Sequence, residues 1–123
     1  NRIRQPFNVS RIGLAAAAAA LADQDFIEKT RLINDEQMRW LEKQFDALGL
    51  GFVKSHANFI MVEVQVEMED ITAASIHQAL LEQGVIVRPL DAYGLPNWLR
   101  ITVGVAEDNL RLIDTLRSIL TED

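Results

Sequence analysis

Residues 84–104 read GVIVRPLDAYGLPNWLRITVG, and this stretch decides the fold of the chain. It contains two short apolar runs, and each run carries one arginine, Arg88 in the first and Arg100 in the second. The runs predict strands over 85–88 and 98–103, because the residues between them are rich in proline, glycine, asparagine and aspartate, which form turns. A connection of this length can join antiparallel neighbours, so we expect the two strands to pair.

The two arginines are unusual in strands of this kind. Burying an unpaired guanidinium costs several kcal/mol on a rough scale, so each arginine needs an anion. Side chains alternate along a strand, so Arg100 is expected to point away from the face that carries Leu99, Ile101 and Val103. Both guanidinium groups can then reach one place and bind a carboxylate or a phosphate with two hydrogen bonds each. The alternative is that one or both pair with internal acids such as Asp91 or Glu63.

The rest of the chain predicts helices and strands in a simple order. Periodicity and turn residues favour helices from Ser10 to Ala22, over roughly 25 residues after Asp23, over 72–83 and over 106–120. Further strands are expected at 51–53 and 58–66. The fold class is therefore α+β, with one small, mainly antiparallel sheet and helices packed mostly on one face.

The predicted helices show their ends and their buried faces. Ser10 and Asp23 are expected N-caps, and Gly49 and Gly84 stand where helix-ending glycines belong. Six alanines at 15–20 favour a helix and allow close approach of another backbone. The apolar stripe of the long helix is predicted at Phe26, Ile33, Trp40, Leu41, Phe45 and Leu48, and that of the last helix at Leu110, Ile113, Leu116 and Leu120.

Composition excludes several classes of protein. The chain of 123 residues has the size of one domain, and its net charge of −6 argues against a nucleic-acid partner, which needs a basic face. No cysteine is present, which excludes disulfides and is compatible with a reducing, cytoplasmic compartment. The apolar segment LAAAAAALAD is too short to span a membrane. The chain begins at Asn1 without an initiator methionine, which indicates a piece of a longer protein.

Other candidates for chemistry are weak. His56 and His77 have no cysteine or carboxylate at metal-ligand spacing, so no metal site is predicted. The serines lack the Gly-x-Ser-x-Gly context of a hydrolase, and no glycine-rich phosphate loop is present. The acidic run 67–70 is interpreted as a solvated loop.

Four segments together resemble a known family. VIVRP, a short glycine-containing loop and then LRITVG are similar to the C-terminal end of the histidinol-phosphate aminotransferases, which are pyridoxal-phosphate enzymes of the aspartate aminotransferase fold. SHANFIMVEV resembles the family's Ser-x-x-Asn-Phe strand, and RQPFNVS before the alanine-rich helix resembles the start of its small domain. The resemblance covers essentially the whole chain, in order, and implies that residues 1–123 are one domain, the C-terminal small domain of a longer homodimeric enzyme.

The resemblance also implies roles for the two arginines. The family's Leu-Arg arginine, here Arg100, holds a substrate anion, and the Arg-Pro arginine, here Arg88, provides a second anion contact. The implied substrates are small anions, namely histidinol phosphate or its ketone partner and glutamate or 2-oxoglutarate.

The resemblance does not extend to the cofactor site. The lysines of this chain, Lys29, Lys43 and Lys54, do not stand in the sequence context of the family's Schiff-base lysine. Pyridoxal phosphate is therefore expected in the full-length enzyme, and neither cofactor binding nor catalysis is expected of this chain alone.

Two interpretations of different classes stay open at this point. The chain is either the substrate-binding small domain of an aminotransferase or a stand-alone, non-catalytic module that acts in dimerisation or anion binding. Within the first interpretation, a related aromatic aminotransferase or phosphate-amine decarboxylase shares these motifs.

Overall fold

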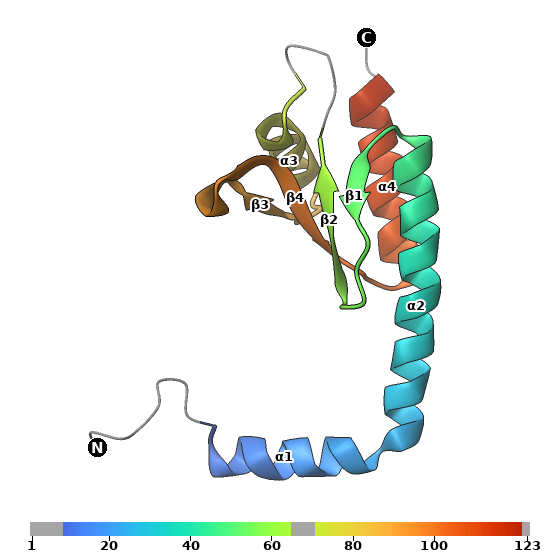
Figure 1. Ribbon diagram of the computed structural model, residues 1–123, viewed down its shortest axis with the longest axis vertical. Helices are drawn as coiled ribbons and strands as arrows, with labels where there is room; N and C mark the ends of the chain where they lie inside the picture. The colour runs from blue at the N-terminus through green and yellow to red at the C-terminus, as the bar shows by residue number, and fades with distance from the viewer. Residues whose placement is uncertain (1–8, 65–70, 122–123) are drawn as a thin grey trace, which may run out of the picture. The chain divides into compact units, whose positions relative to one another are not determined.

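The structure, a computed structural model, describes residues 9–64 and 71–121 (Figure 1). The chain divides into two compact units, residues 1–32 and residues 33–123. Among the described residues, no helix is both long enough and apolar enough to cross a lipid bilayer. The predicted acidic run 67–70 and the last residues of the predicted strand 58–66 lie outside the described residues.

The first unit contains helix α1 (Arg11–Ala22) and the start of helix α2 (Gln24–Ala47). Both predicted N-caps are confirmed: the hydroxyl of Ser10 accepts a hydrogen bond from the Gly13 N–H at 3.0 Å, and the Asp23 carboxylate accepts one from the Phe26 N–H at 3.1 Å. No side chain of α1 is buried. The six alanines thus lie in a helix, and all six are exposed in the described part of the chain.

The predicted stripe of α2 is correct only in its second half. Met38, Leu41 and Phe45 are buried, whereas Phe26 is 65% exposed and Ile33 is 44% exposed. The periodicity continues along the whole helix, but only the turns from Met38 onward lie against a core. Gly49, with φ of 71°, ends α2 as predicted, because the Leu50 N–H donates to the Phe45 carbonyl.

The second unit contains one antiparallel sheet in the order β1-β2-β4-β3. Its strands are β1 (Gly51–Val53), β2 (Phe59–Glu63), β3 (Arg88–Leu90) and β4 (Leu95–Thr102). Helices α3 (Ala73–Glu82) and α4 (Ala106–Thr121) pack with the second half of α2 around the buried residues of the sheet. Every sheet residue of that core belongs to one alternating set, including Ile60, Val62, Leu99 and Ile101, so the helices cover one face. The predicted α+β class is confirmed.

The hairpin of 84–104 differs in its boundaries from the prediction. The first strand begins at Arg88 and not at Val85, because the Val85 N–H donates to the Leu80 carbonyl and so closes the end of α3. The second strand begins at Leu95, directly after Gly94, whose φ of 75° reverses the chain after a short 3₁₀ turn, η1 (Asp91–Tyr93). A register irregularity between Pro89 and Leu90 accommodates this turn.

The buried face of α4 also differs from the prediction. Leu110 was expected inside but is 49% exposed, and the buried positions are Asn109, Leu112, Ile113 and Leu116. These four positions have the spacing i, i+3, i+4, i+7, which is one helical face. The prediction was wrong here because a polar residue, Asn109, occupies the first position of that face.

Asn109 closes the connection between β4 and α4. Its amide oxygen accepts from the Gly104 N–H, and its amide nitrogen donates to the Gly104 carbonyl and to the Gln37 side chain, all at 2.9 Å. Asn109 is 2% exposed, so these hydrogen bonds take the place of those that its side chain would make with water. The single side chain therefore ties β4 to α4 and to α2.

We expect Asn109→Leu to lower the free energy of unfolding by about 1–3 kcal/mol, because half-buried polar groups of Gly104 and Gln37 lose their partner. Urea denaturation measures this. The matched control is Asn97→Leu, on the exposed part of β4, where no side-chain hydrogen bond is lost and the change should be within about 0.5 kcal/mol. Equal losses for both variants would contradict the role of Asn109.

Candidate functional site

Strands β3 and β4 bring the two predicted arginines together. Arg88 and Arg100 are direct partners in the antiparallel register, so their side chains leave the sheet on the same side. The neighbours of Arg100 along β4, Leu99 and Ile101, are buried at 1% and 3% exposure on the helix-covered side. The predicted separation of faces is confirmed, and both arginines lie on the face that the helices leave open.

Neither arginine pairs with an acid among residues 9–64 and 71–121. Ion pairs of that part of the chain include two that join residues three apart on helices, Arg31 with Glu28 at 2.7 Å and Arg117 with Asp114 at 3.1 Å. In the first, the hydrogen bond and charge of Arg31 lower the pKa of Glu28. The alternative that Asp91 or Glu63 neutralises an arginine of the pair is therefore not observed.

Aromatic rings take the place of those acids. The guanidinium of Arg88 lies 5.7 Å from the centre of the Tyr93 ring and donates a hydrogen bond to its hydroxyl at 3.1 Å. The guanidinium of Arg100 lies 5.2 Å from the centre of the Phe59 ring. Such cation–π contacts orient a guanidinium and leave its charge in place.

The electrostatics of this arrangement are unfavourable without a ligand. Like charges directly opposite each other across two strands destabilise a sheet. The chain contains 18 acidic residues, yet the described ones leave Arg88 and Arg100 unpaired. An anion bound between them would remove the repulsion and satisfy both planar donor groups.

Sequence reasoning missed the two aromatic residues of the site. Tyr93 stands in a loop rich in turn-forming residues, and its distance of five residues from Arg88 was the only available signal. Phe59 is opposite Thr102 in the register and so reaches Arg100 diagonally, which depends on strand pairing. No local pattern reveals a diagonal contact of that kind.

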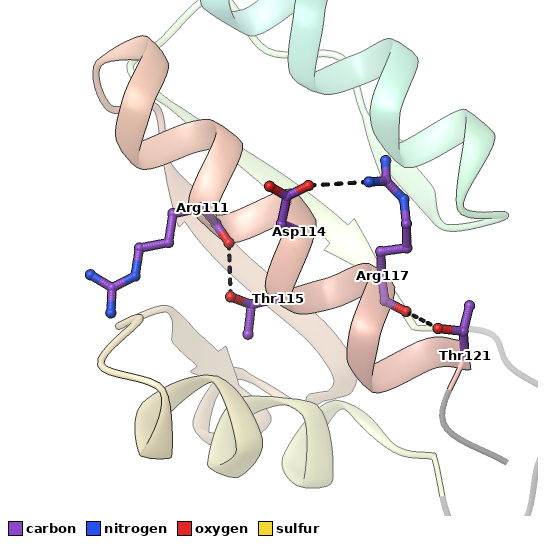
Figure 2. A network of polar contacts seen from close by, with 5 residues as sticks. All are labelled: Arg111, Asp114, Thr115, Arg117 and Thr121. Carbon is purple, nitrogen blue, oxygen red and sulfur yellow. Dashed lines mark hydrogen bonds and ion pairs between the residues drawn. The ribbon is translucent and has the colours of Figure 1, made fainter.

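The arginines of helix α4, Arg111 and Arg117, have structural roles. Arg111 donates to the Gln83 carbonyl at 2.7 Å and so fixes the end of α3 that leads into β3. Figure 2 shows polar contacts along α4, where Arg117 donates to Asp114, and where Thr115 and Thr121 donate to carbonyls four residues earlier in the helix. These contacts belong to the helix surface, and Arg117 already has an acidic partner in Asp114.

The remaining candidates lie on other elements than the two arginines. His56 is exposed and His77 is half-buried, and no group of three metal-binding side chains occurs in the described ranges. The lysines are all exposed: Lys29 and Lys43 lie on α2, and Lys54 follows β1, the edge strand farthest from β3. The arrangement can therefore bind and orient an anion, and the hydroxyl of Tyr93 lies beside Arg88.

Comparison with known proteins agrees with this fold. Residues 1–116 match the family described as aminotransferase class I and II. Histidinol-phosphate aminotransferase 1 of Psychrobacter arcticus is 86% identical over 123 residues, which are all of this chain and 32% of that protein. Histidinol-phosphate aminotransferase 2 of Pseudomonas aeruginosa is 46% identical, again over all of this chain and 32% of its own length.

A solved structure has a similar fold. The histidinol-phosphate aminotransferase from Sinorhizobium meliloti, crystallised in complex with pyridoxal-5'-phosphate, superposes with a TM-score of 0.72 at 28% identity and covers 96% of this chain and 33% of that one. The chain thus spans about a third of the length of its relatives. Since the match with the family extends over nearly all of its residues, this chain belongs to the class I and II aminotransferases.

Proposed function

We propose that residues 1–123 form the substrate-binding small domain of a pyridoxal-phosphate-dependent histidinol-phosphate aminotransferase. The proposed reaction of the full-length enzyme converts histidinol phosphate and 2-oxoglutarate into imidazole acetol phosphate and glutamate. The observation that carries the proposal is the pair of arginines on the open face of the sheet, opposite each other and without an acidic partner among the described residues.

The proposed substrates match what this pair can bind. Histidinol phosphate carries a phosphate, and glutamate carries two carboxylates, so every substrate presents an anion to a guanidinium. We assign the main substrate anion to Arg100, whose direction is fixed by an eight-residue strand, and the second anion contact to Arg88, at the start of β3. Binding at two points orients a substrate as well as holding it.

The cofactor would be held mainly by parts of the enzyme other than these residues. A Schiff-base lysine is normally activated by removal from water or by a neighbouring cation in a site. Lys29, Lys43 and Lys54 are exposed, so none of them has the water-excluded surroundings that suit a Schiff-base lysine. In this proposal the chain contributes substrate binding, and the chemistry of the cofactor belongs to a separate large domain.

The exposed apolar side chains of the first unit support a longer protein. Ile12, Leu21 and Phe26 are 83%, 68% and 65% exposed. Exposed apolar side chains that form a contiguous patch generally mark contact with a partner. We assign them to contacts with the large domain and with the second subunit of a homodimer, in an enzyme of the cytoplasm.

The proposal is tested by comparing the full-length protein with the isolated chain. The full-length protein should form glutamate from histidinol phosphate and 2-oxoglutarate, measured by a coupled glutamate assay. The isolated chain should be inactive, and after incubation with pyridoxal phosphate and borohydride its peptide map should show no specific lysine adduct.

Two outcomes would contradict this proposal. A specific adduct on one lysine of the isolated chain, Lys54 for example, would show that the chain forms a cofactor site by itself. Transamination of phenylalanine by the full-length protein, with no turnover of histidinol phosphate, would instead indicate an aromatic aminotransferase.

A further inference from the structure

Two side-chain amides of helix α2 hold one end of the β2–β4 strand pair. Asn34 donates from its amide nitrogen to the Ala57 carbonyl at 3.1 Å, just before β2 begins at Phe59. Gln37 accepts at 2.9 Å from Asn109, the side chain that closes the connection after β4. Residues three apart lie on the same side of a helix. One side of α2 therefore bonds the chain before β2 and the chain after β4.

The start of β2 and the end of β4 are also joined to each other. Phe59 is opposite Thr102 in the antiparallel register, and the Val103 N–H donates to the Asn58 carbonyl at 2.8 Å. The hydrogen bonds of the Asn109 side chain begin at the next residue along the chain. The ladder between the two strands therefore leads directly into the side-chain bonds to α2.

Arg100 lies close to this end of the strand pair. It stands two residues before Thr102 on β4, and its guanidinium lies 5.2 Å from the centre of the Phe59 ring. Arg100 is half-buried and has no ion pair within the described ranges, so its place depends on the strand that carries it and on this ring. The strand and the ring are both held, at this end, by the amides of α2.

Helix α2 extends beyond the sheet in the other direction. It begins at Gln24, and its first turn carries Phe26, which the proposed function assigns to contacts outside this chain. Gln37 stands on the same helix, one position before the first buried residue, Met38. The bond from Gln37 to Asn109 therefore connects the end of β4 to the helix that leads toward the rest of the enzyme.

We propose that Gln37, acting through Asn109, is a positioning residue for Arg100. It fixes the end of β4 against α2 and so sets the place of the guanidinium relative to the large domain. Gln37 is on a helix of the covered side of the sheet, so it acts on the substrate only through Arg100. This inference rests on the proposed function, because it requires that Arg100 bind a substrate anion.

The test is Gln37→Met in the full-length enzyme, because methionine has a similar length and offers only a weak acceptor to Asn109. We expect kcat/KM for histidinol phosphate to fall about tenfold, since a small misplacement of an orienting group is enough for such a loss. The bonds from Asn109 to Gly104 stay in place, so the melting temperature should fall by no more than a few degrees. Gln37→Glu keeps an oxygen acceptor for Asn109, so its kcat/KM should stay within about twofold of the wild type.

The matched control is Gln44→Met. Gln44 is also on α2, seven residues later and so on the same side of the helix, and it is half-buried like Gln37. Its side chain makes no hydrogen bond in the described part of the chain. Gln44→Met should therefore leave kcat/KM unchanged, and a loss equal to that of Gln37→Met would overturn the inference.

Arg100→Ala and Gln37→Met/Arg100→Ala show whether the effect passes through Arg100. If it does, Gln37→Met should change kcat/KM less than about twofold in the Arg100→Ala background, because the group that it positions is absent. A merely structural role would give the same loss in both backgrounds, and that result would overturn the inference.

The same variants separate this inference from the proposed function. If Arg100→Ala lowers kcat/KM for histidinol phosphate but Gln37→Met does not, the positioning role is wrong and Arg100 still binds the substrate. If Arg100→Ala leaves kcat/KM unchanged, the assignment of Arg100 to the substrate is wrong, and the role of Gln37 falls with it.

Discussion

Arg100→Ala is expected to lower kcat/KM of the full-length enzyme by about a hundredfold, because the substrate anion loses a charge and two aligned donors, and charge-assisted hydrogen bonds contribute about 1.5–3 kcal/mol each. Arg100→Lys keeps the charge but loses the planar fork, so a decrease of about tenfold is expected. Steady-state kinetics with varied histidinol phosphate and glutamate measure both variants.

The stability of the Arg100 variants separates substrate binding from a structural role. The described residues contain no acid paired with Arg100, so its removal should leave the melting temperature nearly unchanged. The matched control is Arg117→Ala, which removes an exposed arginine paired with Asp114 on α4 and should leave kcat/KM unchanged. A large loss of melting temperature in Arg100→Ala, with kinetics altered only in proportion to lost fold, would refute the substrate contact.

Phe45→Ala is expected to lower the free energy of unfolding by about 3–5 kcal/mol, which is the usual cost of deleting a buried phenyl group. Phe45 is 0% exposed, and its ring centre lies 6.4 Å from that of Phe52 on β1. The substitution removes apolar burial and leaves a cavity between α2 and the sheet. Chemical denaturation followed by circular dichroism measures the loss.

The same helix offers a matched control. Phe26 is also on α2 but is 65% exposed, so Phe26→Ala should change the free energy of unfolding by no more than about 0.5 kcal/mol in the isolated chain. Similar losses for both variants would show that the core does not include the second half of α2 in the way described.

Local sequence patterns were sufficient for most of the elements. The caps at Ser10 and Asp23 and the glycines after α2 and α3 act within a few residues, so their hydrogen bonds form wherever the helix forms. Alternation along a strand likewise predicted that Arg100 points to the other face of the sheet from Leu99 and Ile101, because the pleat alone determines that direction.

Two of the errors occurred where one polar group had a choice of partners. Val85 looks like a strand residue, but its N–H completes the end of α3 and is not available to the sheet. Asn109 looks like a surface residue of α4, but three hydrogen bonds to Gly104 and Gln37 make its burial favourable. Competition between a local and a distant partner is decided by the whole fold and not by propensity.

For the candidate site, the sequence by itself identified Arg88 and Arg100 as candidates and determined the face of β4 from which Arg100 projects. It also carried the family resemblance that implies a role for both arginines. Only the tertiary structure decided that Arg88 stands directly opposite Arg100, and that aromatic rings of Tyr93 and Phe59, and no described carboxylate, are their neighbours. The physical reason is register: a shift of one residue in strand pairing turns every side chain to the other face, and the chain's pattern predicts the strands without specifying which residues meet across them.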